Sequence, residues 1–354
     1  MRTLWLFDIE PHEQRYTSEW KAYLSKQLRS AMRGTKSTKW RLRTVSGNKT
    51  SGKTSNGAFI NFAETNLYKA DQVRKFTKFL LNGEVKGGDR LLFTDAWHPG
   101  IIQCRYMADL YRVRYDIHSI WHAGSYDKND LLGQHPLTPR WAMPFERAVF
   151  RACSRNYFAT EYHRDLCIKR LSVRRSISHR VVGWPMEYLR GALGIHDNPT
   201  KSKTILFPHR LSKEKQPEFV KRLQTHLPEY TIVVAQRKKL SKWDYRQLVG
   251  ECAAVLSFSK QETLGIGVYE AMLCGAVPIV PEWLSYKELY PSHCYPAEWI
   301  NSPKNFKKHA ADLAVHIRSS IAAHQQNPII LKDWTKAVGK QHFNGSALYA
   351  ELLR

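Results

Sequence analysis

Short apolar runs alternate with amphipathic helical patterns along the first half of the chain. The run 3-TLWLFDI-9 is apolar enough for a buried strand, and 90-RLLFTDAW-97 predicts a second one. The segment 17-TSEWKAYLSKQLRSAM-32 has the period of an amphipathic helix, with Thr17 or Ser18 as its cap. The other predicted elements of this half are strands at 41–45, 116–122, 156–160 and 179–185 and helices at 101–111, 144–153 and 161–171.

The same alternation restarts after residues 191–203, a stretch rich in Gly, Asn and Pro that is typical of a linker. Strands that alternate with helices predict an α/β fold with mainly parallel sheets. We expect two facing Rossmann-like domains, residues 1–190 and 191–335, with the ligand in the cleft between them, because open α/β sheets bind ligands beyond the carboxyl ends of their strands. The predicted elements of the second half are strands at 203–208, 230–236, 252–259 and 276–281, helices at 215–227 and 266–275, and a long helical tail.

Charge adds a class of partner to this picture of the fold. Of the 354 residues, 43% are hydrophobic and 12% aromatic, as in a globular protein. The 55 Lys and Arg against 31 Asp and Glu give a net charge of +24, more than one small anionic ligand requires. This excess indicates a polyanionic partner, nucleic acid first and an anionic membrane surface second. A generally basic, soluble surface is the alternative.

The six cysteines are scattered, and no C-x-x-C pair occurs. This pattern predicts buried thiols in a reducing compartment, and Cys153, His163 and Cys167 lack the fourth ligand and the paired spacing of a zinc site. The first apolar run is too short for a signal peptide, and no stretch approaches the ~20 apolar residues that span a bilayer. We expect a soluble, cytoplasmic monomer.

The stretch 262-ETLGIGVYEAMLCGAVPIVP-281 carries the most chemistry. Gly265 and Gly267 lie in a predicted turn between a strand and a helix, which presents free N–H groups and the positive helix end to a diphosphate. Glu262 and Glu270 flank this turn, where each carboxylate can accept hydrogen bonds from sugar hydroxyls. A nucleotide-sugar has hydroxyls at both ends and charge in the middle. An ordinary strand–turn–helix unit with a surface Glu is the alternative.

Two cations follow the predicted strand 203–208. Arg210 and Lys215 lie five residues apart at its carboxyl end, within 209-HRLSKEKQPEF-219. Arg can fork onto phosphate oxygens, and Lys can add a point charge to a leaving diphosphate. A solvated, basic helix start is the alternative in so basic a chain.

Together these two segments resemble the donor domain of retaining GT-B glycosyltransferases, the superfamily of sucrose synthase, glycogen synthase and bacterial mannosyltransferases. The family's G-R-L-x-x-E-K-G is similar to H-R-L-S-K-E-K-Q at 209–216, and its E-x7-E motif with E-A-M-x-x-G is similar to the chain at 262–279. The resemblance implies that Arg210 and Lys215 bind the diphosphate, that Glu262 contacts the donor sugar and that Glu270 holds the ribose. The implied donor site is Arg210, Lys215, Glu262, Thr263, Leu264, Gly265 and Glu270, with a UDP-sugar as co-substrate and no further cofactor.

The resemblance also assigns roles to histidines in the first half. His122, in 118-HSIWHAG-124, is similar to the family's histidine that faces the donor sugar, and His98 is a weaker candidate on the acceptor side. A satisfied loop histidine is the alternative for both. The end of the chain, about 336–354, resembles the C-terminal helices that cross back onto the first domain.

The chain departs from the family's pattern in two places. The family's Gly-rich loop after the first strand is replaced by 8-DIEPHEQRYTS-18, which implies a specialised acceptor site. The family's Gly-Gly after the second motif is replaced by 282-EWLSYKE-288. Recognition of the sugar and the nucleotide therefore follows less directly from the resemblance than the reaction class does.

The implied reaction is sugar transfer with retention through front-face attack, the departing diphosphate taking the acceptor proton. Orientation and the positive charge around the diphosphate would lower the barrier. No D-x-D motif occurs, so we expect metal-independent transfer. A glycosidase could use Glu262 and Glu270 as acid and nucleophile, but the adjacent phosphate clamp argues against it. The predicted catalytic residues are His122, Arg210, Lys215 and Glu262.

Basic residues gather in the predicted acceptor domain. Residues 1–55 carry twelve Lys and Arg against four acids, and residues 164–180 carry six against one. Interleaved aromatics such as Trp97 and Trp141 are suited to stacking on bases or sugars. We predict a nucleic-acid acceptor, foremost a hydroxymethylated DNA base as in some phage enzymes, or a modified tRNA base. The predicted acceptor-binding residues are Glu10, His12, Arg15, Arg41, Arg43, Lys49, Lys53 and His98.

Three other hypotheses stay open at this point. A glycosyltransferase acting on a lipid or envelope saccharide at an anionic membrane would expose the apolar and basic helix 17–32. A P-loop NTPase is suggested by 47-GNKTSGKTS-55, but 55-SNGAFINF-62 favours a turn and a strand over the helix that a P-loop opens. A non-enzymatic nucleic-acid binding module would leave the predicted donor site without a purpose.

Overall fold

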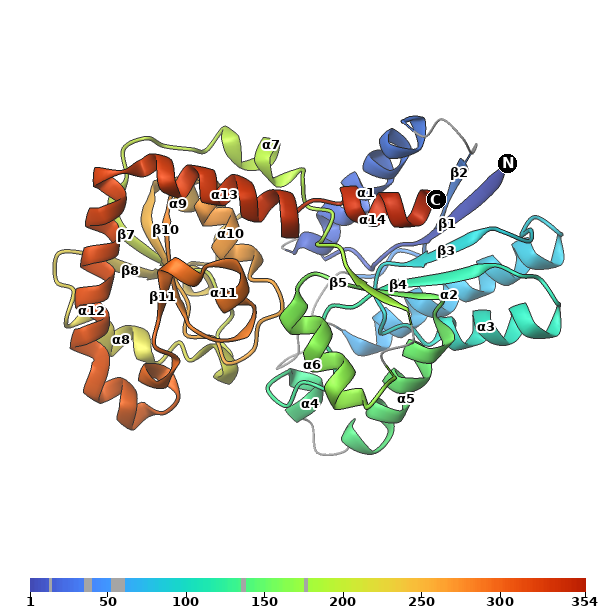
Figure 1. The fold of residues 1–354 in the computed structure, drawn as a ribbon, viewed down its shortest axis with the longest axis horizontal. Helices are drawn as coiled ribbons and strands as arrows, with labels where there is room; N and C mark the ends of the chain where they lie inside the picture. The colour runs from blue at the N-terminus through green and yellow to red at the C-terminus, as the bar shows by residue number, and fades with distance from the viewer. Residues whose placement is uncertain (13–14, 35–39, 52–60, 135–137, 175–177) are drawn as a thin grey trace. The chain divides into compact units, whose positions relative to one another are not determined.

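The structure, a computed structural model, describes residues 1–12, 15–34, 40–51, 61–134, 138–174 and 178–354. It divides into two compact units. Unit 1 comprises residues 1–159, 164–186 and 344–354, and unit 2 comprises residues 160–163 and 187–343. Each unit contains one parallel sheet with helices on both faces (Figure 1), which confirms the predicted α/β class with two Rossmann-like folds.

The six-stranded sheet of unit 1 has the order β2-β1-β3-β4-β5-β6. The register pairs Phe7 with Val45 and Phe93, so the carboxyl ends of the first strands meet at one edge of the sheet. The strands are β1 (Arg2–Phe7), β2 (Trp40–Val45), β3 (Arg90–Phe93), β4 (Asp116–Ile120), β5 (Arg155–Phe158) and β6 (His179–Val181).

Helices cover both faces of this sheet. Helices α2, α3 and α5 pack side by side on one face over an apolar core that includes Trp5, Phe76 and Phe93. On the other, α1 and α14 lie together, and Leu353 in α14 accepts a hydrogen bond from the Trp40 indole at 3.2 Å. The helices are α1 (Tyr16–Arg33), α2 (Phe62–Leu81), α3 (Gly100–Leu110), α4 (Leu131–Gln134), α5 (Thr138–Ala152), α6 (Glu161–Leu171, which begins in unit 2) and α14 (Ser346–Leu353).

The five-stranded sheet of unit 2 has the order β11-β10-β9-β7-β8. Helices α8 and α12 are joined by a 4.1 Å stack of Phe219 on Phe306, and α10 packs against α7, α9 and α13. The strands are β7 (Ser202–Phe207), β8 (Thr231–Val234), β9 (Cys252–Leu256), β10 (Val277–Pro281) and β11 (Cys294–Tyr295). The helices are α7 (Leu189–Gly194), α8 (Phe219–Gln224), α9 (Lys242–Glu251), α10 (Ile266–Leu273), α11 (Leu284–Leu289), α12 (Pro303–Gln326) and α13 (Pro328–His342), with 3-10 turns η1 (Lys213–Lys215), η2 (Ala235–Lys238), η3 (Pro291–His293) and η4 (Ala297–Ile300).

Helix α2 is the main element that the apolar pattern did not predict. Its buried face consists of Thr65, Tyr68, Gln72, Phe76 and Leu80. Two of these five side chains are polar, which weakens the hydrophobic period that marks a helix. The helix begins at Phe62, after an Asn61 cap, whereas the Lys53-Thr54 pair of the P-loop pattern lies outside the described residues. The segment 191–203, predicted as a linker, begins with the end of α7.

Helix α1 turns its apolar side to the core of unit 1. Trp20, Leu24 and Leu28 are buried, whereas Tyr23 is partly exposed. Burial accounts for the apolar stripe that a membrane-surface enzyme would have exposed. Among the described residues, no helix is both long and apolar enough to cross a bilayer.

The six cysteines are all free thiols, five of them buried. Burial raises the pKa of the Cys153 thiol to about 12 and that of Cys252 to about 12, so these groups stay protonated and unreactive. The prediction of buried thiols is confirmed for Cys104, Cys153, Cys167, Cys252 and Cys274, and Cys294 is half-buried.

Candidate functional site

The loop after β7 places Arg210 at the carboxyl edge of the unit 2 sheet. Its Nε donates to Ser212 Oγ at 3.0 Å, and Nε and Nη2 donate to Glu214 Oε1 at 2.8 and 2.6 Å. Glu214 is buried, whereas the Arg210 side chain is 34% exposed. The buried carboxylate therefore fixes the direction of a guanidinium that still reaches the surface.

Lys215 ends the same loop and meets Glu262 from the loop after β9. Its Nζ lies 3.2 Å from Glu262 Oε2 and donates to the Gln261 carbonyl. Burial alone would raise the pKa of Glu262, but the charge of Lys215 and hydrogen bonds hold that pKa at about 2. Glu262 is therefore ionised at neutral pH, and it lies beside the buried cation of Lys215.

Gly265 forms the turn between Glu262 and α10. Its φ of +78° is strained for any side chain, and a Cβ there would lie 2.8 Å from the Tyr286 ring. At Gly267 a Cβ would lie 3.0 Å from Pro208, so the first turn of α10 packs directly against the loop that carries Arg210. The approach of Gly267 to Pro208 places the N-terminus of α10, whose first N–H groups favour an anion, beside the loop that carries Arg210 and Lys215.

Glu270 lies one turn into α10. Tyr245, from α9, donates its hydroxyl to Glu270 Oε2 at 3.1 Å. Thr263 and Leu264, which follow Glu262 before the turn at Gly265, are buried. The structure thus places six of the seven predicted donor residues on two loops of unit 2 and the seventh, Glu270, in helix α10, which follows the second loop.

His209 belongs to this site although the motifs did not single it out. It is buried, its charge interacts with Lys215, Glu262 and Arg210, and burial lowers its pKa to about 3. Its Nε2 is buried and has no hydrogen-bond partner among the described residues. Its position directly before Arg210, at the end of a strand, was the only signal in the sequence.

The segment 282–288 that replaces the family's Gly-Gly has an unusual backbone. Leu284 adopts a φ of +56°, a left-handed conformation that costs a leucine about 1–2 kcal/mol. The Trp283 indole donates to the Ser259 carbonyl at 2.8 Å, which ties this segment to the strand end before Glu262. A bulky residue therefore adopts a backbone conformation here that glycine would adopt at lower cost.

In unit 1 the carboxyl edge of the sheet carries three carboxylates. Asp8 follows β1 and accepts from Lys21 Nζ, from Ser46 Oγ at 2.6 Å and from the Tyr68 hydroxyl at 2.6 Å. Burial, followed by the charge of Asp8, raises the pKa of the Tyr68 phenol well above its ordinary value, so Tyr68 stays a donor. The Asp8 carboxylate is therefore fully engaged by neighbouring side chains.

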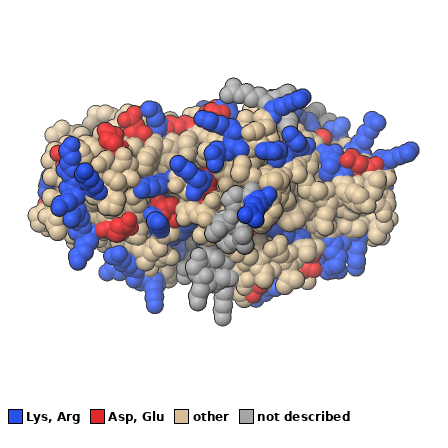
Figure 2. Space-filling model, turned by 90° about the horizontal axis from the view of Figure 1, so that it is seen from below, with Lys and Arg blue, Asp and Glu red and all other residues tan. Residues whose placement is uncertain are grey.

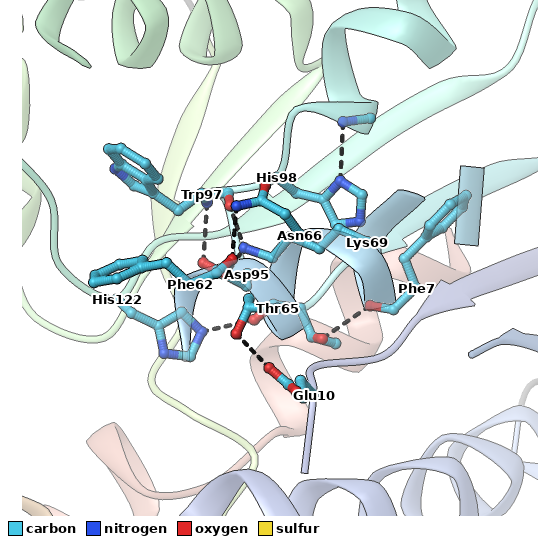
Figure 3. Close-up of polar contacts among 12 residues, drawn as sticks. Phe7, Glu10, Phe62, Thr65, Asn66, Lys69, Asp95, Trp97, His98 and His122 are labelled. Carbon is cyan, nitrogen blue, oxygen red and sulfur yellow. Dashed lines mark hydrogen bonds and ion pairs between the residues drawn. The ribbon is translucent and has the colours of Figure 1, made fainter. Parts of the chain in front are cut away.

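Figure 3 shows the other two carboxylates beside the β3 end and α2. Glu10 accepts a hydrogen bond from Thr65 Oγ1 and lies 3.4 Å from His12 Nε2. Asp95 accepts from Lys69 Nζ at 2.7 Å and from the Trp97 N–H at 2.9 Å. Burial would raise the pKa of Asp95, but Lys69 holds it at about 2, so this carboxylate is ionised.

His122 lies at the end of β4 with both ring nitrogens bonded. Its Nε2 lies 2.6 Å from the Thr94 carbonyl, which can only accept, so Nε2 carries the proton. Nδ1 then accepts from the Tyr16 hydroxyl at 2.6 Å. The rings of Tyr16, Trp20 and Trp184 surround the imidazole at 4.5–5.8 Å. Contact with a donor sugar through a ring nitrogen would require one of these bonds to break.

His98 is likewise fully bonded. Its Nδ1 accepts from the Gly100 N–H at 3.0 Å at the start of α3, and its Nε2 therefore donates to Gln72 Oε1 at 3.0 Å. Burial lowers its pKa to about 3, which keeps the ring neutral. This geometry matches the satisfied loop histidine that the sequence left as the alternative.

The cations predicted to hold the acceptor have different surroundings. Arg43 packs its guanidinium 4.1 Å from the Phe79 ring and pairs with Glu84 at 2.5 Å, so it is part of the packing of unit 1. Arg41 and Lys49 are exposed, whereas Arg15 is half-buried next to α1. Lys53 lies outside the described residues.

Basic side chains are dispersed over the face that Figure 2 presents, with acidic side chains between them. Within the part of the chain that the structure describes, no group of three His, Cys, Asp or Glu residues could hold a metal ion.

Comparison with solved structures supports the fold, although no known family model matches the chain. A sucrose-phosphate synthase from Thermosynechococcus elongatus superposes with a TM-score of 0.62 at 11% identity, covering 100% of this chain and 98% of that one. Alr3699/HepE from Anabaena, solved with UDP and glucose, gives 0.58 at 13% identity over 100% and 99%. The catalytic domain of starch synthase IV from Arabidopsis thaliana, bound to ADP and acarbose, gives 0.53 at 12% identity over 100% and 98%. The chain therefore has the GT-B fold.

Proposed function

We propose that the protein is a retaining glycosyltransferase that takes its sugar from a nucleotide-sugar bound to unit 2. One observation carries this proposal. Arg210, the Lys215–Glu262 pair and the N-terminus of α10 adjoin one another within a single unit. Two cations and free N–H groups next to an ionised carboxylate suit a diphosphate that is joined to a hydroxylated sugar.

The chemistry of the proposed transfer follows from these groups. Lys215 and Arg210 supply positive charge to the diphosphate as it leaves, and their anchoring by Glu262 and Glu214 fixes them before the reaction begins. The ionised Glu262 accepts hydrogen bonds from the donor sugar, and Glu270 accepts from the ribose. The leaving diphosphate takes the acceptor proton, so this step needs no nucleophile and no metal from the protein.

UDP is our first choice of nucleotide. Alr3699/HepE, whose fold resembles that of this chain over the whole length, was solved in complex with UDP and glucose. The catalytic domain of starch synthase IV, whose fold this chain also resembles, was solved with ADP, so ADP-sugars belong in the same test.

For the acceptor we propose nucleic acid, foremost a hydroxymethylated base in DNA. The net charge of +24 favours a polyanion. Trp141 is 55% exposed and packs edge to face on Trp97 at 5.7 Å, which leaves an aromatic surface for a base. In a duplex, the modified base would have to be flipped out of the stack to reach the site.

The test is incorporation of labelled sugar into hydroxymethylated DNA, unmodified DNA and tRNA, with UDP-, ADP- and GDP-sugars as donors. We expect transfer from a UDP-sugar to hydroxymethylated DNA only, with an anomeric configuration that matches the donor. Nucleotide-sugar hydrolysis without transfer to any nucleic acid would preserve the donor assignment and reject the acceptor. Transfer to lipid-linked saccharide in vesicles would move the acceptor to the membrane. Absence of both hydrolysis and UDP binding would reject the proposal.

A further inference from the structure

A cavity lies at the amino edge of the unit 1 sheet, at the opposite ends of the strands from Asp8 and Asp95. Its volume is about 320 Å³, at the small end of ligand pockets, which range over roughly 300–1,000 Å³. Arg90, Asp116 and Arg155 line it, and each is the first residue of its strand. The end of α14 also borders it. No group of the proposed transfer reaction lines this cavity.

Residues of both charges line the cavity. Arg90, Arg155 and Arg354 border it together with Asp116 and Glu351. Glu351 pairs with Arg354 at 3.0 Å, and Arg90 Nε lies 3.9 Å from Asp116.

Arg155 provides the uncompensated charge. Its Nη1 donates to the Ser178 hydroxyl, and no described carboxylate lies within 4.0 Å of its guanidinium. Besides lying near Asp116, Arg90 binds the end of α14, because its Nη1 donates to the Glu351 and Leu352 carbonyls at 3.2 and 2.7 Å. The cation with the most capacity for a ligand is therefore Arg155.

His118 adds a buried polar atom without a partner. The side chain is 3% exposed and lines the cavity, and its Nδ1 lies 2.8 Å from the Tyr157 hydroxyl. Its Nε2 is buried and has no hydrogen-bond partner among the described residues. Burial lowers its pKa to about 3, so the ring is neutral. An orphaned buried nitrogen costs free energy until a ligand or a water supplies a partner.

We infer that this cavity binds a small phosphorylated polyol, such as a sugar phosphate. Arg155 would hold the phosphate, assisted by Arg354, because guanidinium groups fork onto phosphate oxygens. Asp116 and Glu351 would accept hydrogen bonds from hydroxyls, and His118 Nε2 would gain a partner. The two carboxylates disfavour an anion without hydroxyls, so bare phosphate fits less well. Because the lining joins three strands to α14, the ligand acts as an effector that stabilises unit 1.

The experiment measures thermal unfolding of the full chain with glucose 6-phosphate, with inorganic phosphate and with glucose, each in the presence of excess UDP. UDP occupies the proposed phosphate site of unit 2 and so removes that site from the result. We expect glucose 6-phosphate to raise Tm by a few degrees and the other two probes to raise it less. Arg155→Gln should abolish the shift, whereas Arg29→Gln, on an exposed cation of α1, should retain it.

Asp116→Asn gives a second readout. The substitution should not disturb folding, since this side chain is 55% exposed. It should weaken glucose 6-phosphate binding about tenfold without weakening phosphate binding, because only hydroxyls use the carboxylate. The inference fails if no probe shifts Tm, if Arg155→Gln responds like the original chain, or if Asp116→Asn weakens both probes equally. A shift with UDP alone reports on the donor site, so the two proposals fail separately.

Discussion

The carboxyl edges of the two sheets differ in what surrounds their ion pairs. In unit 2, two cations and a helix N-terminus converge, and each cation is held by one carboxylate. In unit 1, three carboxylates gather, and Asp8 and Asp95 are each paired with a lysine, Lys21 and Lys69. Each edge thus holds two cations and three carboxylates, since Glu270 is the third carboxylate of unit 2. We name the unit 2 edge cationic after the helix N-terminus that adds positive potential to its cations, and the unit 1 edge acidic after its three carboxylates.

The difference teaches what each edge can bind. A cationic edge with ionised Glu262 suits a diphosphate bearing a sugar, whereas an acidic edge suits hydroxyls and repels phosphates. If unit 1 holds a nucleic-acid acceptor, its phosphates must contact exposed cations away from this edge, such as Arg41 and Lys49. The edge itself would receive the modified base.

Lys215→Met provides the strongest test of the cationic edge. Removal of one preorganised positive group from a leaving diphosphate is expected to lower kcat about 10²–10³-fold. UDP affinity should fall as well, because Glu262 then repels the diphosphate. The measurement is transfer or hydrolysis of a UDP-sugar together with UDP titration.

Lys213→Met is the matched control, because Lys213 is exposed in the same 3-10 turn. It should change activity less than about twofold. Since Glu262 loses its partner in Lys215→Met, circular dichroism must first show that the variant is folded. If the folded Lys215→Met variant had unchanged turnover, Lys215 would have no role at the leaving diphosphate and this part of the proposed function would be wrong.

Glu10→Gln tests the acidic edge in the same way. The substitution preserves the shape of the side chain beside Thr65 and His12 but removes its charge. We expect about a tenfold loss of kcat/KM for the acceptor, as for one charge-assisted hydrogen bond, and unchanged UDP affinity. Glu84→Gln, at a half-exposed pair with Arg43 on the same unit, should leave both quantities unchanged. A loss of UDP affinity in Glu10→Gln would contradict the division of roles between the edges.

Buried histidines should make both edges lose stability in acid. Burial lowers the pKa of His98 in unit 1 and of His209 in unit 2 to about 3. Since the unfolded chain binds these protons below about pH 6.5, the stability that each neutral ring contributes is complete above that pH and is lost as the pH falls toward 3. Each ring should contribute a slope of up to about 1.4 kcal/mol per pH unit to the free energy of unfolding.

Leucine variants separate the two rings. His209→Leu should reduce this slope with little loss of stability at pH 7, because its Nε2 has no described partner. His98→Leu should reduce the slope but also cost about 1–3 kcal/mol at pH 7, since Gln72 and the Gly100 N–H lose their partner. Denaturant unfolding at several pH values measures both effects, and equal losses at pH 7 would show that His209 has a partner after all.

The cationic edge could be predicted from the sequence because its parts are contiguous. Arg210 and Lys215 lie in one loop. Glu262 and Gly265 lie in another, and Glu270 follows in helix α10, so the spacing within each segment was enough to group them. His209 was missed because nothing in a single sequence distinguishes it from any residue at a strand end.

The acidic edge could be predicted only in part, because helix α2 supplies half of it. Thr65, Tyr68 and Lys69 contact Glu10, Asp8 and Asp95, yet polar residues on the buried face of α2 conceal its helical period. The pairing of those side chains also depends on the register of β1 and β3, which local pattern does not reveal. The polar residues of α2 that contribute to the acidic edge are therefore also the reason why this helix could not be predicted from its apolar pattern.

The smallest predicted effect uses one strained residue from each unit. Arg112, after α3, and Lys239, after η2, are exposed and have φ of +54° and +48°. Glycine relieves this strain but loses more chain entropy on folding, so Arg112→Gly and Lys239→Gly should each stabilise by about 0.5 kcal/mol. Arg114→Gly, at an exposed site of ordinary φ, should instead destabilise by about 0.5–1 kcal/mol. Chemical unfolding distinguishes these signs, and a destabilised Arg112→Gly would mean that its side chain, rather than its backbone, contributes to the packing of unit 1.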